Sequence, residues 1–113
     1  MASITIWHNP NCGTSRTALA LLQEAGHAVQ VIEYLKSPPD AATLARVAQA
    51  VGGARALLRT QGTTAQERGL PTADAAAILA AMLADPILIN RPVVIGPGGT
   101  VLARPAPRAL EAA

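Results

Sequence analysis

The sequence predicts an α/β fold in which a mixed four-stranded sheet, formed by a βαβ unit and then a ββα unit, is flanked by helices. β-rich segments at 3–7 and 29–35 lie on either side of a helical pattern at 14–25. Two strands joined by a crossover helix are parallel. Near the end of the chain, short β-rich runs at 92–95 and 100–103 flank a turn of three glycines and one proline, which is typical of an antiparallel hairpin.

Each element of these two units has its own signal. Residues 3–7 alternate polar and apolar side chains, as strands do. The segment 14–25 repeats the apolar residues alanine and leucine at helical spacing, and Gly26 is expected to end it. The run 29–35 predicts a second, largely buried strand. After Pro105, one short last helix is expected.

Between the two units, the pattern predicts two helices and a short helical piece. Asp40 is a good N-cap for the first helix, which Gly52 ends. A short helical piece at 54–59 and a polar loop follow. Thr72 can cap the second helix, and Asp85 with Pro86 closes it. The side chains expected to face inward are Leu44, Val47, Ala48, Val51, Ile78, Leu79, Met82 and Leu83.

Length, charge and cysteine content exclude several classes of protein. A chain of 113 residues predicts one domain, over 1–113. Its net charge of +2 is too small and dispersed for a protein that binds nucleic acid or an anionic membrane. One cysteine forms no internal disulfide, and two histidines beside it offer no metal-ligand spacing. No signal peptide or spanning segment is evident, so we expect a cytoplasmic protein.

The single cysteine, Cys12, lies in the turn between the first strand and the first helix. A thiol at a helix N-terminus faces unpaired N–H groups and the positive end of the helix dipole, and both stabilise thiolate. The N–H groups of Gly13, Thr14 and Ser15 can also hold an oxyanion beside the sulfur. Ser15 occupies the position of the second cysteine in a Cys-x-x-Cys redox pair. The Ser15 hydroxyl could donate a hydrogen bond to the thiolate, but it cannot resolve a disulfide. The alternative is an inert, buried core cysteine.

Four other side chains are candidates for the same site. His8, four residues before the cysteine, could lower the thiol pKa as an imidazolium or accept a proton as a neutral ring; the alternative is a loop histidine bonded to backbone. Arg91 and Arg104 each precede a proline at one end of the hairpin, where the predicted fold brings the loop at Arg91 close to the cysteine turn. Arg59 follows an Ala-Leu-Leu run. Considered without the predicted fold, each arginine is expected to be an ordinary surface charge. In the predicted fold, the three arginines can converge on one anion.

These residues resemble the glutaredoxin-coupled arsenate reductases, a family with a thioredoxin-like fold. The resemblance follows family order over nearly the whole chain, and its first segment is highly specific. The matching segments are ITIWHNPNCGTSR at 4–16, YLKSPP at 34–39, RALLR at 55–59, PILINRPVV at 86–94 and Arg104-Pro105.

The resemblance implies reduction of arsenate to arsenite, with Cys12 as the nucleophile and His8 helping to depress its pKa. It also implies that Arg59, Arg91 and Arg104 bind arsenate and the intermediates, and that the peptide bond before the proline after Arg91 is cis. No tightly bound cofactor is expected. Glutathione would be the co-substrate and glutaredoxin the partner that supplies electrons.

Two other functions remain open at this stage. The protein could be a monothiol oxidoreductase that acts on another substrate, with Cys12 glutathionylated in its cycle. It could also be a non-catalytic redox-sensing regulator of the same fold that binds a protein such as RNA polymerase. Regulators of that type usually carry Cys-x-x-Cys, so Ser15 counts against this reading.

Overall fold

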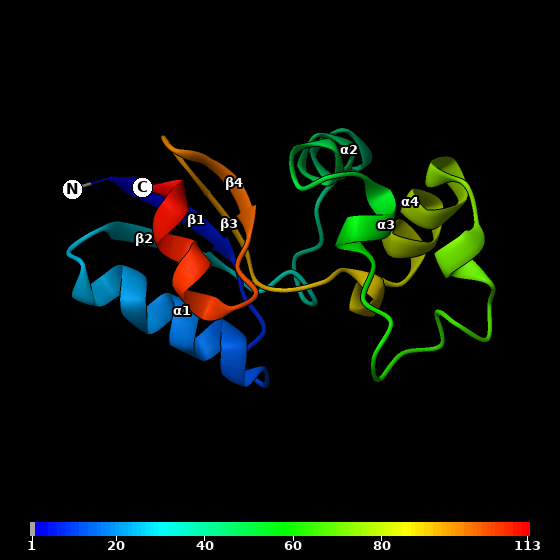
Figure 1. The fold of residues 1–113 in the computed structure, drawn as a ribbon, viewed down its shortest axis with the longest axis horizontal. Helices are drawn as coiled ribbons and strands as arrows, with labels where there is room; N and C mark the ends of the chain where they lie inside the picture. Colours follow the sequence, from blue (N-terminus) through cyan, green and yellow to red (C-terminus); the bar gives the residue numbers. More distant parts are fainter. Residues whose placement is uncertain (1) are drawn as a thin grey trace. The chain divides into compact units, whose positions relative to one another are not determined.

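The computed structural model describes residues 2–113, which form two compact units. One unit combines residues 2–37 with residues 91–113, and the other consists of residues 38–90. Figure 1 shows both along the chain, with the sheet in the first unit and a group of helices in the second. The prediction of one domain over 1–113 stays a prediction.

The sheet of the first unit has four strands in the order β2-β1-β3-β4. β1 (Ser3–Trp7) pairs in parallel with β2 (Ala28–Ile32) and antiparallel with β3 (Val93–Gly96). β3 in turn pairs antiparallel with β4 (Gly99–Leu102). The predicted mixed sheet, a parallel βαβ pair followed by an antiparallel hairpin, is therefore confirmed.

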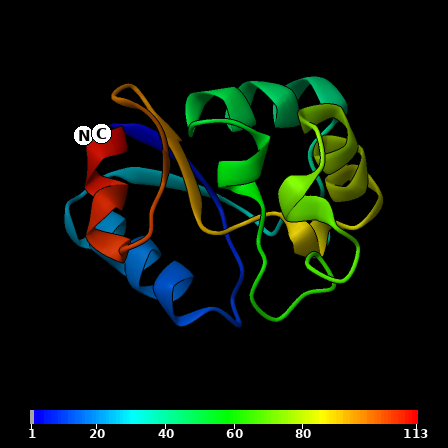
Figure 2. The same cartoon turned by 45° about the vertical axis from the view of Figure 1, so that its right-hand side comes forward.

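One face of this sheet carries the core of the unit. The helix α1 (Gly13–Glu24) and the 3-10 helix η3 (Ala106–Ala112) pack side by side against it, as Figure 2 shows. Alanines dominate where these helices meet the sheet, which lets their backbones approach closely. The buried cluster consists of Ile4, Ile6, Ala18, Leu22, Val94, Val101, Ala103, Ala106, Ala109 and Ala112.

β2 differs from its prediction in length and burial. The strand ends at Ile32, because the following residues form a turn in which the Lys36 N–H donates to the Glu33 carbonyl at 2.9 Å. β2 also lies at an edge of the sheet, and Val31 is 42% exposed. The prediction of a largely buried strand was wrong because an apolar run alone does not tell a central strand from an edge strand.

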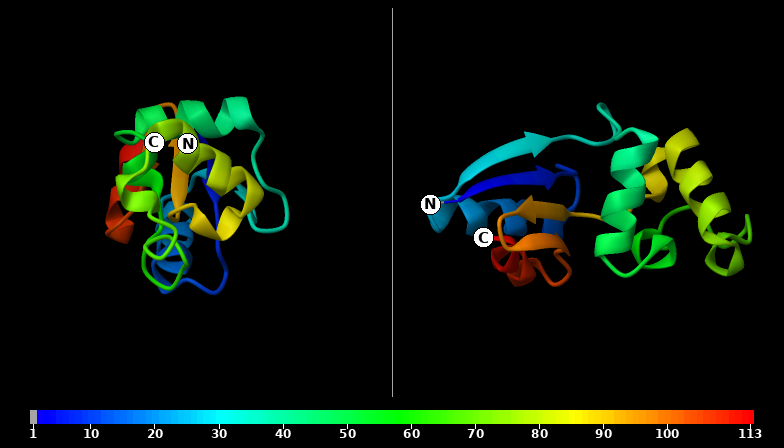
Figure 3. Two further views of the ribbon diagram at one scale, coloured as in Figure 1. Left: turned by 90° about the vertical axis from the view of Figure 1, so that its right-hand side faces the viewer. Right: turned by 90° about the horizontal axis from the view of Figure 1, so that it is seen from above.

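The second unit packs three α-helices together: α2 (Ala41–Ala50), α3 (Ala54–Leu57) and α4 (Ala75–Ala84). Figure 3 shows α2 and α4 from above. Asp40 caps α2 as predicted, since its side chain accepts the Thr43 N–H at 2.8 Å. This bond also lowers the pKa of the Asp40 carboxyl, because it favours the charged form.

Two predictions about α4 were wrong. Asp74 is its N-cap and accepts the Ala77 N–H at 2.8 Å, whereas Thr72 ends the preceding 3-10 helix η1 (Leu70–Thr72). Leu83, expected to face inward, is 38% exposed. Every residue of α4 is apolar, so the sequence pattern does not define which face is buried. A second 3-10 helix, η2 (Pro86–Leu88), follows.

Candidate active site

The turn that carries Cys12 begins at the C-terminal end of β1. The His8 N–H donates to the Ile32 carbonyl at 2.8 Å, which extends the β1–β2 pairing by one residue. The Asn9 carbonyl then accepts the Cys12 N–H at 3.0 Å, and the Asn9 side-chain oxygen accepts the Asn11 N–H at 3.0 Å. Asn9 therefore closes this turn from both its backbone and its side chain. Sequence reasoning did not single out Asn9, although an Asn-Pro step typically begins such a turn.

Cys12 occupies the N-cap position of α1 and has an extended backbone conformation. Its side chain is 8% exposed. Burial raises the pKa of the Cys12 thiol, while the Ser15 N–H, the Arg91 charge, the Arg104 guanidinium and the Thr14 N–H lower it. The net pKa lies below the ordinary value, because the N–H groups and positive charges together outweigh desolvation.

Arg91 and Arg104 stand at the two ends of the β3–β4 hairpin. Arg104 Nη1 lies 3.9 Å from Cys12 Sγ and donates to the Arg91 carbonyl at 3.1 Å. The Ala103 N–H donates to the Pro92 carbonyl at 2.9 Å, so the pairing of the hairpin continues up to the two arginines. The cis bond predicted before Pro92 is confirmed, and the bond between Arg104 and its proline is cis as well.

His8 contacts Ser15 and is itself buried. His8 Nδ1 lies 2.6 Å from Ser15 Oγ, and Ser15 Oγ accepts the Asn9 N–H at 3.1 Å. The Ser15 hydroxyl therefore bonds to these neighbours, while the Ser15 backbone N–H faces the sulfur. Burial lowers the pKa of His8, the Glu33 carboxylate raises it and the Arg16 guanidinium lowers it, with a net lowering. Of the two forms left open for His8, these surroundings favour the neutral ring.

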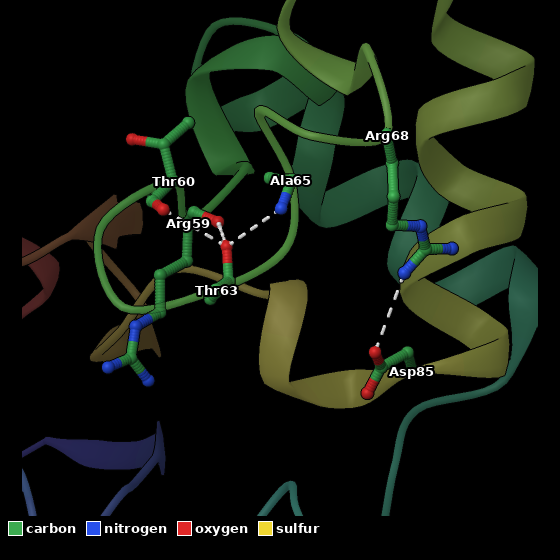
Figure 4. A network of polar contacts seen from close by, with 6 residues as sticks. All are labelled: Arg59, Thr60, Thr63, Ala65, Arg68 and Asp85. Atoms are coloured by element: carbon green, nitrogen blue, oxygen red, sulfur yellow. Dashed lines mark hydrogen bonds and ion pairs between the residues drawn. The ribbon is translucent and has the colours of Figure 1, made fainter.

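Arg59 belongs to the other unit, where it is the second residue after Leu57, the last residue of α3. Its N–H donates to the Leu88 carbonyl at 2.8 Å, and its side-chain Nε donates to the Gln61 carbonyl at 3.1 Å. Thr63 Oγ1 donates to the Arg59 carbonyl at 2.8 Å, and Figure 4 shows the arginine side chain extending away from Thr63. The role predicted for Arg59 in anion binding stays a prediction.

Neither a metal-ligand cluster nor a membrane-spanning helix occurs among residues 2–113. Within these residues, no three or more His, Cys, Asp or Glu side chains gather as a metal would require. None of the helices in the same stretch is both long and apolar enough to cross a membrane. In the first unit, the Cys12 thiol lies beside N–H donors and guanidinium groups.

Comparison with known proteins places this chain in a family. The sequence model of the ArsC family matches residues 7–112. An arsenate reductase of Rhizobium meliloti (strain 1021) is 46% identical over an alignment of 112 residues, which covers 96% of this chain and 80% of the relative. An arsenate reductase of Escherichia coli (strain K12) is 42% identical over 116 residues, covering 98% of this chain and 81% of the relative.

A solved structure agrees with these sequence matches. The arsenate reductase from Vibrio cholerae superimposes with a TM-score of 0.90 at 38% identity, over 99% of this chain and 98% of that chain. The fold is thus thioredoxin-like, with a lone thiol at the first strand-to-helix turn. The chain belongs to the ArsC family.

Proposed function

We propose that this protein is an arsenate reductase that converts arsenate to arsenite through a Cys12 thiolate. The observation that carries the proposal is the Arg104 guanidinium 3.9 Å from Cys12 Sγ, at a sulfur that also faces the N–H groups of Thr14 and Ser15. A thiolate and donors for an anion are thereby present in one place. Relatives at 42–46% identity that bear the name arsenate reductase support the choice of substrate.

Arsenate is a tetrahedral oxyanion, and its binding is assigned to groups that donate hydrogen bonds. The N–H groups at the start of α1, from Gly13, Thr14 and Ser15, suit its oxygens because a helix N-terminus favours negative charge. Arg91 and Arg104 supply positive charge at the sulfur. The contribution of Arg59 to the same anion rests on the resemblance of its segment to the family.

Reduction of As(V) to As(III) takes two electrons, which two thiols supply when they form one disulfide. The Cys12 thiolate first attacks arsenic; an S–As bond forms, and one arsenate oxygen takes up protons and leaves as water. An external thiolate then attacks the Cys12 sulfur and breaks the S–As bond. The electron pair of that bond goes to arsenic, so arsenite leaves and a mixed disulfide remains. The nearby guanidinium groups stabilise the anionic transition states.

The second thiol must come from outside the protein, because the chain has a single cysteine. We assign this thiol to glutathione and the reduction of the mixed disulfide to glutaredoxin, as the family resemblance implies. The lowered pKa of Cys12 also favours reduction of the mixed disulfide, because a thiol of lower pKa is the better leaving group in thiol–disulfide exchange. Both donors are reductants of the cytoplasm, which is where we place the reaction.

A coupled assay tests the proposal. Arsenate, glutathione, glutaredoxin, its reductase and NADPH are mixed with the protein, and NADPH loss is followed. We expect turnover that needs arsenate, glutathione and glutaredoxin and that disappears in Cys12→Ser. Turnover retained by Cys12→Ser would overturn the thiolate mechanism, and activity on small mixed disulfides without activity on arsenate would favour a monothiol oxidoreductase of another substrate.

A further inference from the structure

The Ser15 side chain lies inside the turn that carries Cys12 and is fully buried. It stands on α1, one turn after the cysteine, yet its hydroxyl points back to the end of β1. There it lies 2.6 Å from His8 Nδ1 and accepts the Asn9 N–H at 3.1 Å. Burying a polar group destabilises the fold unless the group forms hydrogen bonds, and both contacts of this hydroxyl lie within hydrogen-bond distance.

These contacts indicate where the protons lie. Ser15 Oγ accepts the Asn9 N–H and keeps a proton to donate, and His8 Nδ1, 2.6 Å away, can accept that proton's hydrogen bond when the ring is neutral. The imidazole is then neutral and carries its proton on Nε2. A doubly protonated ring would instead aim an N–H at the Ser15 oxygen and force the hydroxyl to turn its proton elsewhere.

Charged groups around His8 do not reverse this assignment. The Glu33 carboxylate favours the imidazolium, whereas the Arg16 guanidinium disfavours it. Burial is the largest of the effects on the pKa of His8 and acts in the same direction as Arg16, because desolvation penalises the charged ring. The positive charge that acts on the sulfur comes from Arg91 and Arg104.

The same hydroxyl is linked to Cys12 through Asn9. Ser15 Oγ holds the Asn9 N–H, and the Asn9 carbonyl accepts the Cys12 N–H at 3.0 Å. Removing the hydroxyl would leave a buried N–H without this acceptor and the His8 ring without this donor. The turn would then hold the sulfur less firmly beside the helix N–H groups.

We propose that Ser15 is a positioning residue whose hydroxyl holds His8 as the neutral Nε2–H tautomer. Through Asn9, the same hydroxyl keeps the Cys12 sulfur beside the N–H groups of α1. This role of the side chain is separate from the contribution of the Ser15 backbone N–H to anion binding. The inference rests on the proposed function in one respect, that Cys12 is the reacting thiol.

Two measurements that do not involve arsenate test this inference. Nitrogen NMR of ¹⁵N-histidine protein at pH 7 reports which ring nitrogen of His8 carries the proton. His27 is an internal reference, since its Nδ1 accepts the Ala2 N–H at 3.1 Å and Ser15 does not contact it. The pH dependence of iodoacetamide alkylation reports the pKa of Cys12.

Three variants separate the hydroxyl from general damage. Ser15→Ala removes it, Ser15→Thr keeps it, and Thr17→Ala removes an exposed hydroxyl from the same helix as a matched control. We expect the wild type, Ser15→Thr and Thr17→Ala to show the Nε2–H tautomer of His8. In Ser15→Ala, the His8 nitrogen signals should shift and alkylation at pH 6 should slow about threefold, because less thiolate is present.

A wild-type spectrum with the proton on His8 Nδ1, or with imidazolium at pH 7, would overturn the inference even if no variant folded. Unchanged His8 signals and alkylation in folded Ser15→Ala would do the same. If arsenate turnover is absent but these two readouts behave as expected, the proposed function fails while the role of Ser15 stands.

Discussion

Arg104 Nη1 contacts Cys12 Sγ at 3.9 Å and the Arg91 carbonyl at 3.1 Å, so one guanidinium joins the hairpin to the cysteine turn. The contact with sulfur lowers the pKa of the thiol, and the contact with the carbonyl fixes the arginine where it can do so. Arg91 then acts on the same sulfur through its charge. The two arginines thus affect Cys12 by different means.

Arg104→Ala should raise the pKa of Cys12, because both the hydrogen bond and the charge at the sulfur are lost. Iodoacetamide alkylation at pH 6 should slow by about three- to tenfold, in proportion to the lost thiolate. Arg108→Ala is the control, since Arg108 is exposed and pairs with Glu111 at 3.3 Å on the same segment. Equal rates in the two variants would contradict a role for Arg104 at the sulfur.

Arg59→Ala should leave the alkylation profile of Cys12 unchanged, because Arg59 is not among the groups that shift the thiol pKa. If Arg59 binds the oxyanion, the KM for arsenate should rise about tenfold, as the loss of a hydrogen bond to a charged group predicts. Arg55→Ala, at an exposed position of α3, serves as the control. A KM no higher than that of Arg55→Ala would remove Arg59 from the site.

The lowered pKa of Cys12 predicts a pH-dependent stability with a defined sign. The folded protein binds the thiol proton less tightly than the unfolded chain, so stability rises with pH between the folded pKa and the ordinary thiol value of about 8.5. As the pH falls through the folded pKa, this contribution is lost. Urea unfolding of reduced wild type and Cys12→Ser should therefore give free energies whose difference shifts in favour of the wild type as the pH rises. A constant difference would mean an ordinary thiol.

The lowered pKa of His8 predicts a loss of stability at acid pH. Its folded pKa is lowered, so the unfolded chain binds the proton more tightly and stability falls as the pH drops through the unfolded value of about 6.5 towards the folded pKa. His8→Gln, which does not titrate, should lack this part of the acid loss. Thermal unfolding of both proteins from pH 8 to pH 5 checks the expectation, and parallel curves would show that His8 titrates normally.

Gly96 lies where the last residues of the chain pack against the hairpin. A Cβ at Gly96 would collide with the Ala112 carbonyl oxygen, so Gly96→Ala should destabilise the fold by about 3 kcal/mol through overpacking. Gly26→Ala is the comparison, because nothing lies within 4 Å of its added Cβ. Its cost should be only the left-handed backbone penalty, about 1 kcal/mol. Chemical denaturation should rank the two variants in this order.

The parts of the fold that the sequence predicted correctly were those that depend on residues close together along the chain. The turn at Cys12 and the paired strands of the hairpin follow from short-range patterns, and so does the cap at Asp40. The side of α4 that is buried was missed because its residues are uniformly apolar. The cap at Asp74 was missed because Thr72, two residues earlier, offers a similar side chain.

The sequence indicated which residues belong to the candidate site better than it indicated how they contact one another. The lone cysteine and the two Arg-Pro pairs pointed to Cys12, Arg91 and Arg104, and the structure brings these together. The bond between His8 and Ser15 could not be predicted, because a spacing of seven residues across a strand, a loop and a helix leaves the loop geometry open. Side-chain direction in a turn depends on backbone angles that the residue types do not specify.

The guanidinium that meets the sulfur comes from a position 92 residues further along the chain. During synthesis, the thiol therefore emerges long before this guanidinium, and until the sheet closes its pKa lacks the lowering that Arg104 supplies. A nascent or misfolded copy would therefore present less thiolate to oxidants and electrophiles than the folded protein does. The part of the thiol acidity that Arg91 and Arg104 supply is thus acquired on completion of the fold, and cysteine labelling during refolding should quicken as the sheet assembles.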